Sequence, residues 1–229
     1  VDADDMIHPK FFTCLMSIMI ESDADIVIGG YSRELKYGTE QKIVEESLSR
    51  ARFMQRRDCK GFVWGRIYKK NIITIRFDER SKIEDADFNA ALISINENLK
   101  IMYTRVPLYF YFFRAGSLVS KLDGRVCMTL GERLYKYALK EKDNELKQAF
   151  VIDSIKRLLA AEYEYRLINE REKSKQCCIL EKRSLKLIYS YKEKVKYGIL
   201  ICFPQLYRLF RIINDPTIKE WEKIQREGK

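Results

Sequence analysis

The sequence contains very little histidine, proline or glycine. Its 229 residues include one His, four Pro and ten Gly, whereas 46% are hydrophobic and 33% are charged. This composition excludes a collagen-like chain, low-complexity disorder and a disulfide-stapled miniprotein. A chain of this length buries about 70% of the surface that its unfolded form exposes, so we expect a substantial core.

Zinc-type cysteine pairs and membrane-spanning segments are also missing from the sequence. The six cysteines form no C-x-x-C pair, and His8 is the only histidine. Cys177 and Cys178 are adjacent, which favours reduced thiols over a disulfide framework. No apolar run reaches the roughly 18 residues of a spanning helix, and no signal-peptide pattern opens the sequence. We therefore expect a cytoplasmic protein.

Positive charge is concentrated in the second half of the chain. The formal net charge is +10, but residues 1–120 hold 18 Lys and Arg against 17 Asp and Glu. Residues 121–229 hold 25 against 16. This asymmetry suggests that the second half meets an anionic surface, or that its lysines form an ordinary solvated exterior.

Helical and strand-like patterns alternate up to about residue 115, which predicts an α/β fold. The expected helices cover 10–20, 41–57 and 85–95, the expected strands cover 25–30, 99–103 and 107–113, and 62–73 is interpreted as a short helix or turn. The remainder is expected to be helical, over 121–141, 144–170 and 181–196. An apolar, aromatic and basic stretch follows over 197–213. It could lie in the interface of an anionic membrane or pack as a helix against the α/β domain.

Two acidic clusters are candidates for chemistry. Asp2, Asp4 and Asp5 place three carboxylates within four residues, which suits Mg²⁺ or Mn²⁺ but also suits the N-terminal cap of a helix. The segment with Glu84 and Asp85 also lies at a predicted helix start, where helical geometry is expected to place Asp87 on the solvent side. It could equally be a cap, or it could supply a general base whose pKa is raised by neighbouring charge and partial burial.

Two further segments carry aromatic and basic side chains. Trp64 could stack on a ligand or pack in the core. Arg114 leaves a predicted strand close to Ser117, where a guanidinium could bind a phosphate.

The order of these motifs resembles that of family-two glycosyltransferases of the GT-A fold, above all those that build bacterial cell-surface polysaccharides. The motifs in chain order are D-A-D-D-x-x-x-P, A-D-I-V-I-G-G-Y, W-G-R-I-Y-K-K, I-E-D-A-D-F-N and P-L-Y-F-Y-F-F-R-A-G-S. They cover residues 1 to about 118. The resemblance implies the C-terminal half of a Rossmann-like GT-A domain over 1–118, followed by a basic helical extension over 119–229.

The resemblance also implies roles for individual residues. Asp4 is the expected direct ligand of a Mg²⁺ or Mn²⁺ ion, with Asp2 supporting it. Asp85 is the expected catalytic base. The remaining implied contacts are Asp5, Arg114 and Ser117 with the donor, and Trp64 and Glu84 with the acceptor.

The implied activity is inverting, metal-dependent transfer of a sugar from a nucleotide-sugar, expected to be a UDP-sugar, to a glycan or lipid-linked glycan. Because the chain opens inside the acidic motif, we expect it to be the later part of a longer enzyme and to bind donor weakly alone. Its expected location is the cytoplasm or the inner face of the cell membrane. An alternative is a basic helical scaffold or nucleic-acid-binding protein. We expect no nucleic acid, because the C-terminal basic residues are interspersed with Glu162, Glu164 and Glu170.

Overall fold

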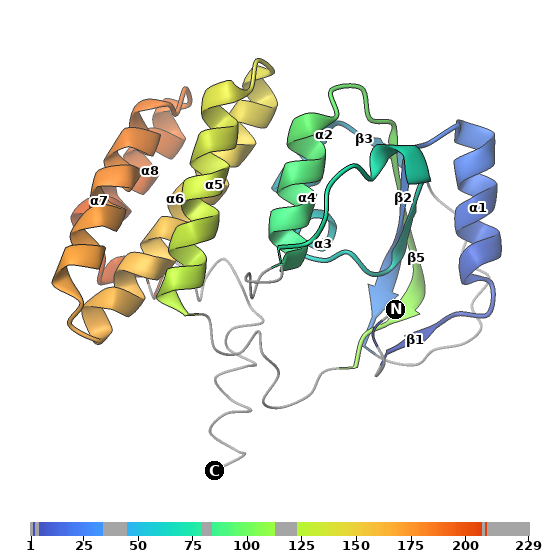
Figure 1. The fold of residues 1–229 in the computed structure, drawn as a ribbon, viewed down its shortest axis with the longest axis horizontal. Helices are drawn as coiled ribbons and strands as arrows, with labels where there is room; N and C mark the ends of the chain where they lie inside the picture. Colours follow the sequence, from blue (N-terminus) through green and yellow to red (C-terminus); the bar gives the residue numbers. More distant parts are fainter. Residues whose placement is uncertain are drawn as a thin grey trace, which may run out of the picture. The chain divides into compact units, whose positions relative to one another are not determined.

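The computed structural model describes residues 2, 5–33, 45–78, 84–112, 123–207 and 209. The chain divides into two compact units, one formed by 1–80 with 84–113 and the other by 81–83 with 114–229. The first unit mixes strands and helices, and the second is helical (Figure 1). The predicted boundary at residue 118 lies outside the described residues and stays a prediction, as does the assignment of the first unit to half of a GT-A domain.

The first unit is a mixed sheet with helices on both faces (Figure 1). Its strands are β1 (Met6–Ile7), β2 (Ile26–Ser32), β3 (Glu45–Leu48), β4 (Arg66–Tyr68) and β5 (Ile101–Phe110). Its helices are α1 (Phe11–Ser22), α2 (Arg50–Gln55), α3 (Arg57–Lys60), the 3₁₀ turn η1 (Lys70–Ile72) and α4 (Glu84–Ile95).

Strand β5 lies at the centre of the described sheet. It pairs in parallel with β2 on one side and antiparallel with both β3 and β1 on the other. β4 extends the sheet as the antiparallel neighbour of β2. The sequence-based expectation of a buried β-branched strand over 25–30 is confirmed by β2, in which Ile26, Val27 and Ile28 are all buried.

An irregularity in β5 changes its register against β2. Ile28 pairs with Tyr103, but Gly30 pairs with Pro107, so β5 accommodates extra residues between these two pairs. A Cβ atom on Gly30 would lie 2.4 Å from the carbonyl oxygen of Arg105. Only glycine therefore allows this close approach of the two backbones.

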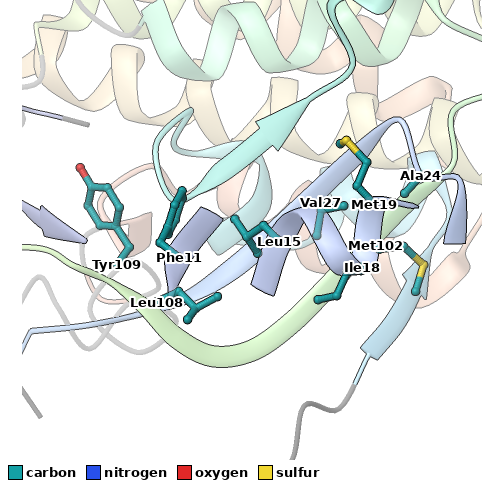
Figure 2. Close-up of a cluster of buried hydrophobic side chains, with 9 residues drawn as sticks. All are labelled: Phe11, Leu15, Ile18, Met19, Ala24, Val27, Met102, Leu108 and Tyr109. Atoms are coloured by element: carbon teal, nitrogen blue, oxygen red, sulfur yellow. The ribbon is translucent and has the colours of Figure 1, made fainter. Parts of the chain in front are cut away.

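Helix α1 covers one face of the sheet with a compact apolar cluster. Figure 2 shows this cluster extending from Tyr109 and Phe11 at one end to Ala24 and Met102 at the other. Val27 contributes from β2, so its side chain lies on the α1 face. The helix ends where Asp23 adopts a left-handed conformation with φ 51°, close to the predicted break at Ser22-Asp23.

Three predictions for the first unit are wrong in whole or in part. Within the predicted helix 41–57, residues 45–48 instead form β3, because pairing with β5 outweighs the helical spacing of the sequence. Ser49 then caps α2 by accepting a hydrogen bond from the N–H of Arg52. Segment 62–73 is only in part the predicted short helix or turn, because strand β4 precedes the 3₁₀ turn η1 within it. The two strands predicted over 99–113 form the single strand β5.

The second unit packs its helices through a seam of small residues. Its helices are α5 (Gly124–Lys140), α6 (Asn144–Leu167), α7 (Arg171–Lys186) and α8 (Tyr191–Cys202). Gly124 and Gly131 lie seven residues apart on one face of α5. A Cβ atom on Gly131 would lie 2.9 Å from a side-chain carbon of Leu158 in α6. This close approach is completed by a hydrogen bond that the Ser154 hydroxyl donates to the carbonyl of Gly131 at 2.7 Å.

The predicted helix over 181–196 is wrong, because a turn separates α7 from α8 within it. Gln148 of α6 holds this turn by donating to the carbonyl of Leu187 and accepting from the N–H of Tyr189. Ser190 then caps α8 by accepting from the N–H of Glu193. The break between α7 and α8 leaves the carbonyl of Leu187 and the N–H of Tyr189 outside both helices, and Gln148 of α6 supplies a hydrogen-bond partner for each.

A buried acidic residue lies between α6 and α7. Glu181 is fully buried near the fully buried Glu162, whose carboxylate pairs with Arg166 at 2.7 Å. Burial, followed by the charge of Glu162, raises the pKa of Glu181 to about 8, and the charges of Arg166 and Lys182 oppose this shift. The folded unit therefore holds a proton on Glu181 at pH values where the unfolded chain has released it.

We predict that Glu181→Gln stabilises the helical unit increasingly as the pH rises. Because the folded pKa of Glu181 lies above its ordinary 4.5, the wild type loses stability between about pH 4.5 and 8, by a few kcal/mol in total. Thermal unfolding from pH 5 to pH 9 should show a growing advantage for the variant. Glu172→Gln, on the exposed side of α7, should show little such trend. A constant advantage of Glu181→Gln at every pH would contradict the prediction.

Candidate active site

The acidic segment at the start of the chain is held against the C-terminal end of β5. Strand β1, which follows Asp5 directly, pairs with β5 through Met6 with Phe110 and Ile7 with Tyr109. The carboxylate of Asp5 accepts hydrogen bonds from the Tyr109 hydroxyl at 2.7 Å and from the N–H of Phe112 at 2.9 Å. Asp5 therefore anchors the segment to the sheet.

Tyr109 connects the acidic segment with the aromatic interior. Its side chain is fully buried, and its hydroxyl donates to Asp5 while accepting from the N–H of Asp2 at 3.2 Å. Burial raises the pKa of Tyr109 well above its usual value, so the hydroxyl remains a donor at neutral pH. The exposed side chain of Asp2 is thus presented beside a rigid, hydrogen-bonded anchor.

Trp64 lies at the centre of an aromatic cluster. Its indole stacks on Tyr109 with ring centroids 4.6 Å apart, on Phe62 at 4.4 Å and on Tyr111 at 5.4 Å. The ring of Tyr31 meets it edge-on at 5.2 Å. Trp64 is half-buried and packs against the α1-side core, so core packing is one of its roles. Its contact with an acceptor stays a prediction.

Asp85 stands at the start of α4, next to the loop that carries Trp64. We call residues 60–65, from the last residue of α3 to the start of β4, the 60–65 loop. The Oδ2 atom of Asp85 accepts a hydrogen bond from the N–H of Val63 at 3.1 Å. The helix itself is confirmed over Glu84–Ile95, close to the predicted range.

The pKa of Asp85 is raised above its ordinary value. Partial burial is the main cause, and the charges of Glu84 and Asp2 add to it, whereas the Val63 N–H and the charge of Arg66 act in the opposite direction. The carboxylate of Asp2 therefore lies within electrostatic range of Asp85. A half-buried carboxylate with a raised pKa suits a general base.

The neighbours of Asp85 on α4 differ sharply in exposure. Glu84 is exposed, and its contact with an acceptor stays a prediction. Asp87 was expected on the solvent side of the helix, but that expectation is wrong, because Asp87 is only 7% exposed. The turn from Ala86 to Ala90 is buried on all sides, so helical periodicity alone misplaced this side chain.

Two residues of the site were missed from the sequence. Tyr109, which the sequence places only within a predicted strand, anchors both Asp2 and Asp5. Asn89 was given no role, yet its side-chain amide donates to the carbonyls of Phe62 at 2.7 Å and Lys60 at 3.1 Å. An asparagine within an apolar helix, four residues after a candidate base, was a signal that could have found it.

Several predicted contacts lie outside the described residues. These are the metal ligand Asp4 and the donor contacts Arg114 and Ser117. The roles of these three residues therefore stay predictions. The predicted donor contact of Asp5 also stays a prediction, with its carboxylate engaged by Tyr109 and Phe112.

The chemistry of the acidic residues fits a hard divalent cation. Within the described residues, no three His, Cys, Asp or Glu side chains form a group that could hold a metal ion. However, the charge of Asp2 disfavours ionisation of Asp85, and a cation nearby would offset this excess negative charge. Carboxylate oxygens are also the ligands that Mg²⁺ and Mn²⁺ prefer.

We predict that Tyr109→Phe destabilises the first unit by about 1–3 kcal/mol, because Asp5 loses a buried hydrogen bond while the ring stack is kept. Urea unfolding followed by tryptophan fluorescence measures this change. Tyr31→Phe is the matched control, because Tyr31 meets Trp64 edge-on and is 39% exposed. Equal stability of the Tyr109→Phe variant and the wild type would show that the hydroxyl bridge contributes nothing.

Comparison with known proteins gives limited support for glycosyl transfer. No protein-family model matches the chain. A curated relative, glycosyltransferase GlyA of Streptococcus pneumoniae serotype 4 (strain ATCC BAA-334 / TIGR4), is 24% identical over 261 aligned residues. The alignment covers 97% of this chain but 37% of the relative, so the chain spans little more than a third of that protein's length. The similarity is distant, and together with the mixed α/β sheet it supports a glycosyltransferase.

Proposed function

We propose that the first unit belongs to an inverting glycosyltransferase in which Asp85 is the catalytic base. The observation that carries the proposal is the placement of Asp85, which is half-buried, bonded to the Val63 N–H and within the field of Asp2. The similarity to a glycosyltransferase supports the same reaction class. The proposed donor is a nucleotide-sugar, expected to be a UDP-sugar, and the proposed acceptor is a glycan or lipid-linked glycan of the cell surface.

Asp85 would remove the proton from the acceptor hydroxyl as that oxygen attacks the anomeric carbon. The new bond forms on the face opposite the departing nucleoside diphosphate, so the configuration at the anomeric carbon is inverted. A single base suffices for this direct displacement. The Val63 N–H engages Oδ2 of Asp85, which leaves the other carboxylate oxygen for the acceptor.

Asp2 and Asp4 would hold a Mg²⁺ or Mn²⁺ ion beside the donor diphosphate. When bound, such an ion supplies positive charge that offsets the charge developing on the leaving group. Asp5 would act by fixing the segment through Tyr109, and Arg114 and Ser117 would contact the diphosphate. Trp64 and Glu84 would line the acceptor side.

We predict that Asp85→Asn in the parent enzyme lowers turnover by about 10²–10⁴-fold, the usual contribution of a positioned base. The wild-type rate should fall as the pH decreases through the pKa of Asp85, because the protonated carboxyl cannot accept the proton. Donor binding, measured by calorimetry, should be retained. Full transfer activity of Asp85→Asn would overturn the assignment of the base.

We also predict that transfer by the parent enzyme requires a divalent cation and is lost in Asp4→Ala. Activity should disappear in excess chelator and return when Mg²⁺ or Mn²⁺ is added back. His8→Ala serves as a control on a nearby side chain outside the proposed ligand set. Undiminished transfer in chelator would remove the metal from the mechanism.

The second unit would bring the enzyme to an anionic membrane surface through α8. Within the described residues, no helix is both long enough and apolar enough to cross a bilayer. However, Tyr191, Val195 and Ile199 form an exposed apolar stripe along α8, and Lys192 and Lys194 are exposed on the same helix. Such a helix can lie in the interfacial plane with its lysines toward the headgroups.

Only some residues of the stretch predicted to contact the membrane are exposed. Within the apolar stretch over 197–213, Tyr197, Leu200 and Ile201 are buried in the helical unit, whereas Phe203 and Leu206 are exposed and continue the stripe. Peripheral attachment to the inner face of the cell membrane would bring the enzyme to the membrane that carries a lipid-linked acceptor.

We predict that Val195→Asp with Ile199→Asp abolishes binding of the chain to vesicles containing phosphatidylglycerol and phosphatidylcholine in equal amounts. Met16→Asp with Ile20→Asp is the matched control, because these residues are also exposed, apolar and four apart on a helix, but α1 contains no lysine. Flotation measures binding, which 1 M salt should weaken because the Debye length falls to about 3 Å. Equal binding to vesicles of phosphatidylcholine alone would refute an electrostatic attraction.

A further inference from the structure

Side chains of helix α4 make hydrogen bonds to both the N–H and the carbonyl of one peptide group in the 60–65 loop. Asp85 accepts from the N–H of Val63 at 3.1 Å, and Asn89 donates to the carbonyl of Phe62 at 2.7 Å. This N–H and this carbonyl belong to the same peptide group, the one that joins Phe62 to Val63. Asp85 and Asn89 are four residues apart, so they lie on one face of the helix, about 6 Å apart along its axis.

The amide of Asn89 is committed to the 60–65 loop. Asn89 is fully buried, and its two N–H donors are taken up by the carbonyls of Phe62 and Lys60 at 2.7 and 3.1 Å. The carbonyl of Cys59 lies at the outer limit of a hydrogen bond, 3.5 Å away. Burying a side-chain amide is costly unless such partners are present, so the loop and Asn89 are matched to each other.

A peptide group transmits orientation and polarisation from one end to the other. Because it is planar and rigid, a bond that fixes the direction of its carbonyl also fixes the direction of its N–H. A donor on the carbonyl also strengthens the N–H as a donor, by about 10–30% per bond in a hydrogen-bonded chain. Both effects would act on the Oδ2 atom of Asp85.

We infer that Asn89 is a positioning residue for Asp85, acting through the Phe62–Val63 peptide group. It keeps the N–H of Val63 directed at Oδ2, so that the other oxygen of Asp85 faces the acceptor. The same contact holds the base against the 60–65 loop, which carries Trp64, one of the two residues proposed to line the acceptor side. The inference rests on the proposed role of Asp85 as the base.

The first test uses the unaltered full chain, labelled with ¹³C and ¹⁵N, in a pH titration followed by NMR. The side-chain carboxyl carbon of Asp85 reports its own ionisation. We expect the amide nitrogen of Val63, the carbonyl carbon of Phe62 and the side-chain amide of Asn89 to shift with the same midpoint. The side-chain amide of Asn96, which donates to the carbonyl of Leu92 at 2.9 Å, is the internal control. An Asn89 amide that does not follow Asp85 would overturn the inference.

The second test compares Asn89→Ala with Asn96→Ala, which removes a similar amide from the C-terminal end of the same helix. Losing the Asn89 contact should weaken the Val63 bond that favours the ionised carboxylate. The midpoint of Asp85 should then rise by about half a pH unit or more, a threefold change in its acid dissociation constant. Asn96→Ala should leave it in place. A folded Asn89→Ala variant with an unchanged Asp85 midpoint would refute the inference. If that variant does not fold, the titration of the unaltered chain decides.

Kinetics of the parent enzyme separate this inference from the proposed function. Asn89→Ala should lower kcat more than it changes KM and should move the acidic limb of the pH profile upward with the Asp85 midpoint. Neither NMR titration needs donor or acceptor, so either can fail while Asp85 is still the base. Full activity of Asp85→Asn would overturn the role of Asp85 by a separate measurement, and with it the role of Asn89 in positioning a base.

Discussion

The parallel pairing of β5 with β2 is the constraint on which the rest of the first unit depends. β5 supplies partners to β1 and β3 on its other side, and its irregular register beside Gly30 sets where its C-terminal end lies. That end carries Tyr109, which holds the acidic segment through Asp5. A change in this one register would therefore displace the acidic cluster from Asp85, because both clusters take their positions from the sheet.

The candidate site combines side chains that are fixed by hydrogen bonds with carboxylates that repel one another. Asp85 is half-buried and feels the negative charge of Asp2, an arrangement that costs folding free energy. The surrounding contacts offset this cost: Tyr109 holds the acidic segment, Asn89 holds the 60–65 loop, and Trp64 of that loop stacks on Tyr109. A strained electrostatic arrangement on a rigid support is typical of sites that carry out chemistry.

The helical unit shows a different balance. Its α5–α6 seam depends on Gly131, where any larger side chain would displace Leu158. Its α6–α7 contact includes Glu181, which burial keeps protonated up to about pH 8. By contrast, the outer side of α8 leaves apolar side chains such as Val195 and Ile199 exposed. The side chains of the interior thus pack closely, while one outer face of α8 leaves apolar side chains exposed to solvent.

Local patterns determined part of this structure from the sequence alone. The β-branched run of β2, the helical spacing of α4 and the acidic clusters around Asp2 and Asp85 could all be identified, because propensity, periodicity and charge act over short distances in the chain. Tertiary contacts decided the rest. β3 is a strand because β5 offers it partners, α7 ends where Gln148 holds the turn, and Asp87 is buried because packing encloses its helix. The spacing within the helix could mark Asn89 as a candidate, but its link to Asp85 passes through a peptide group of another segment, and only the tertiary structure reveals that link.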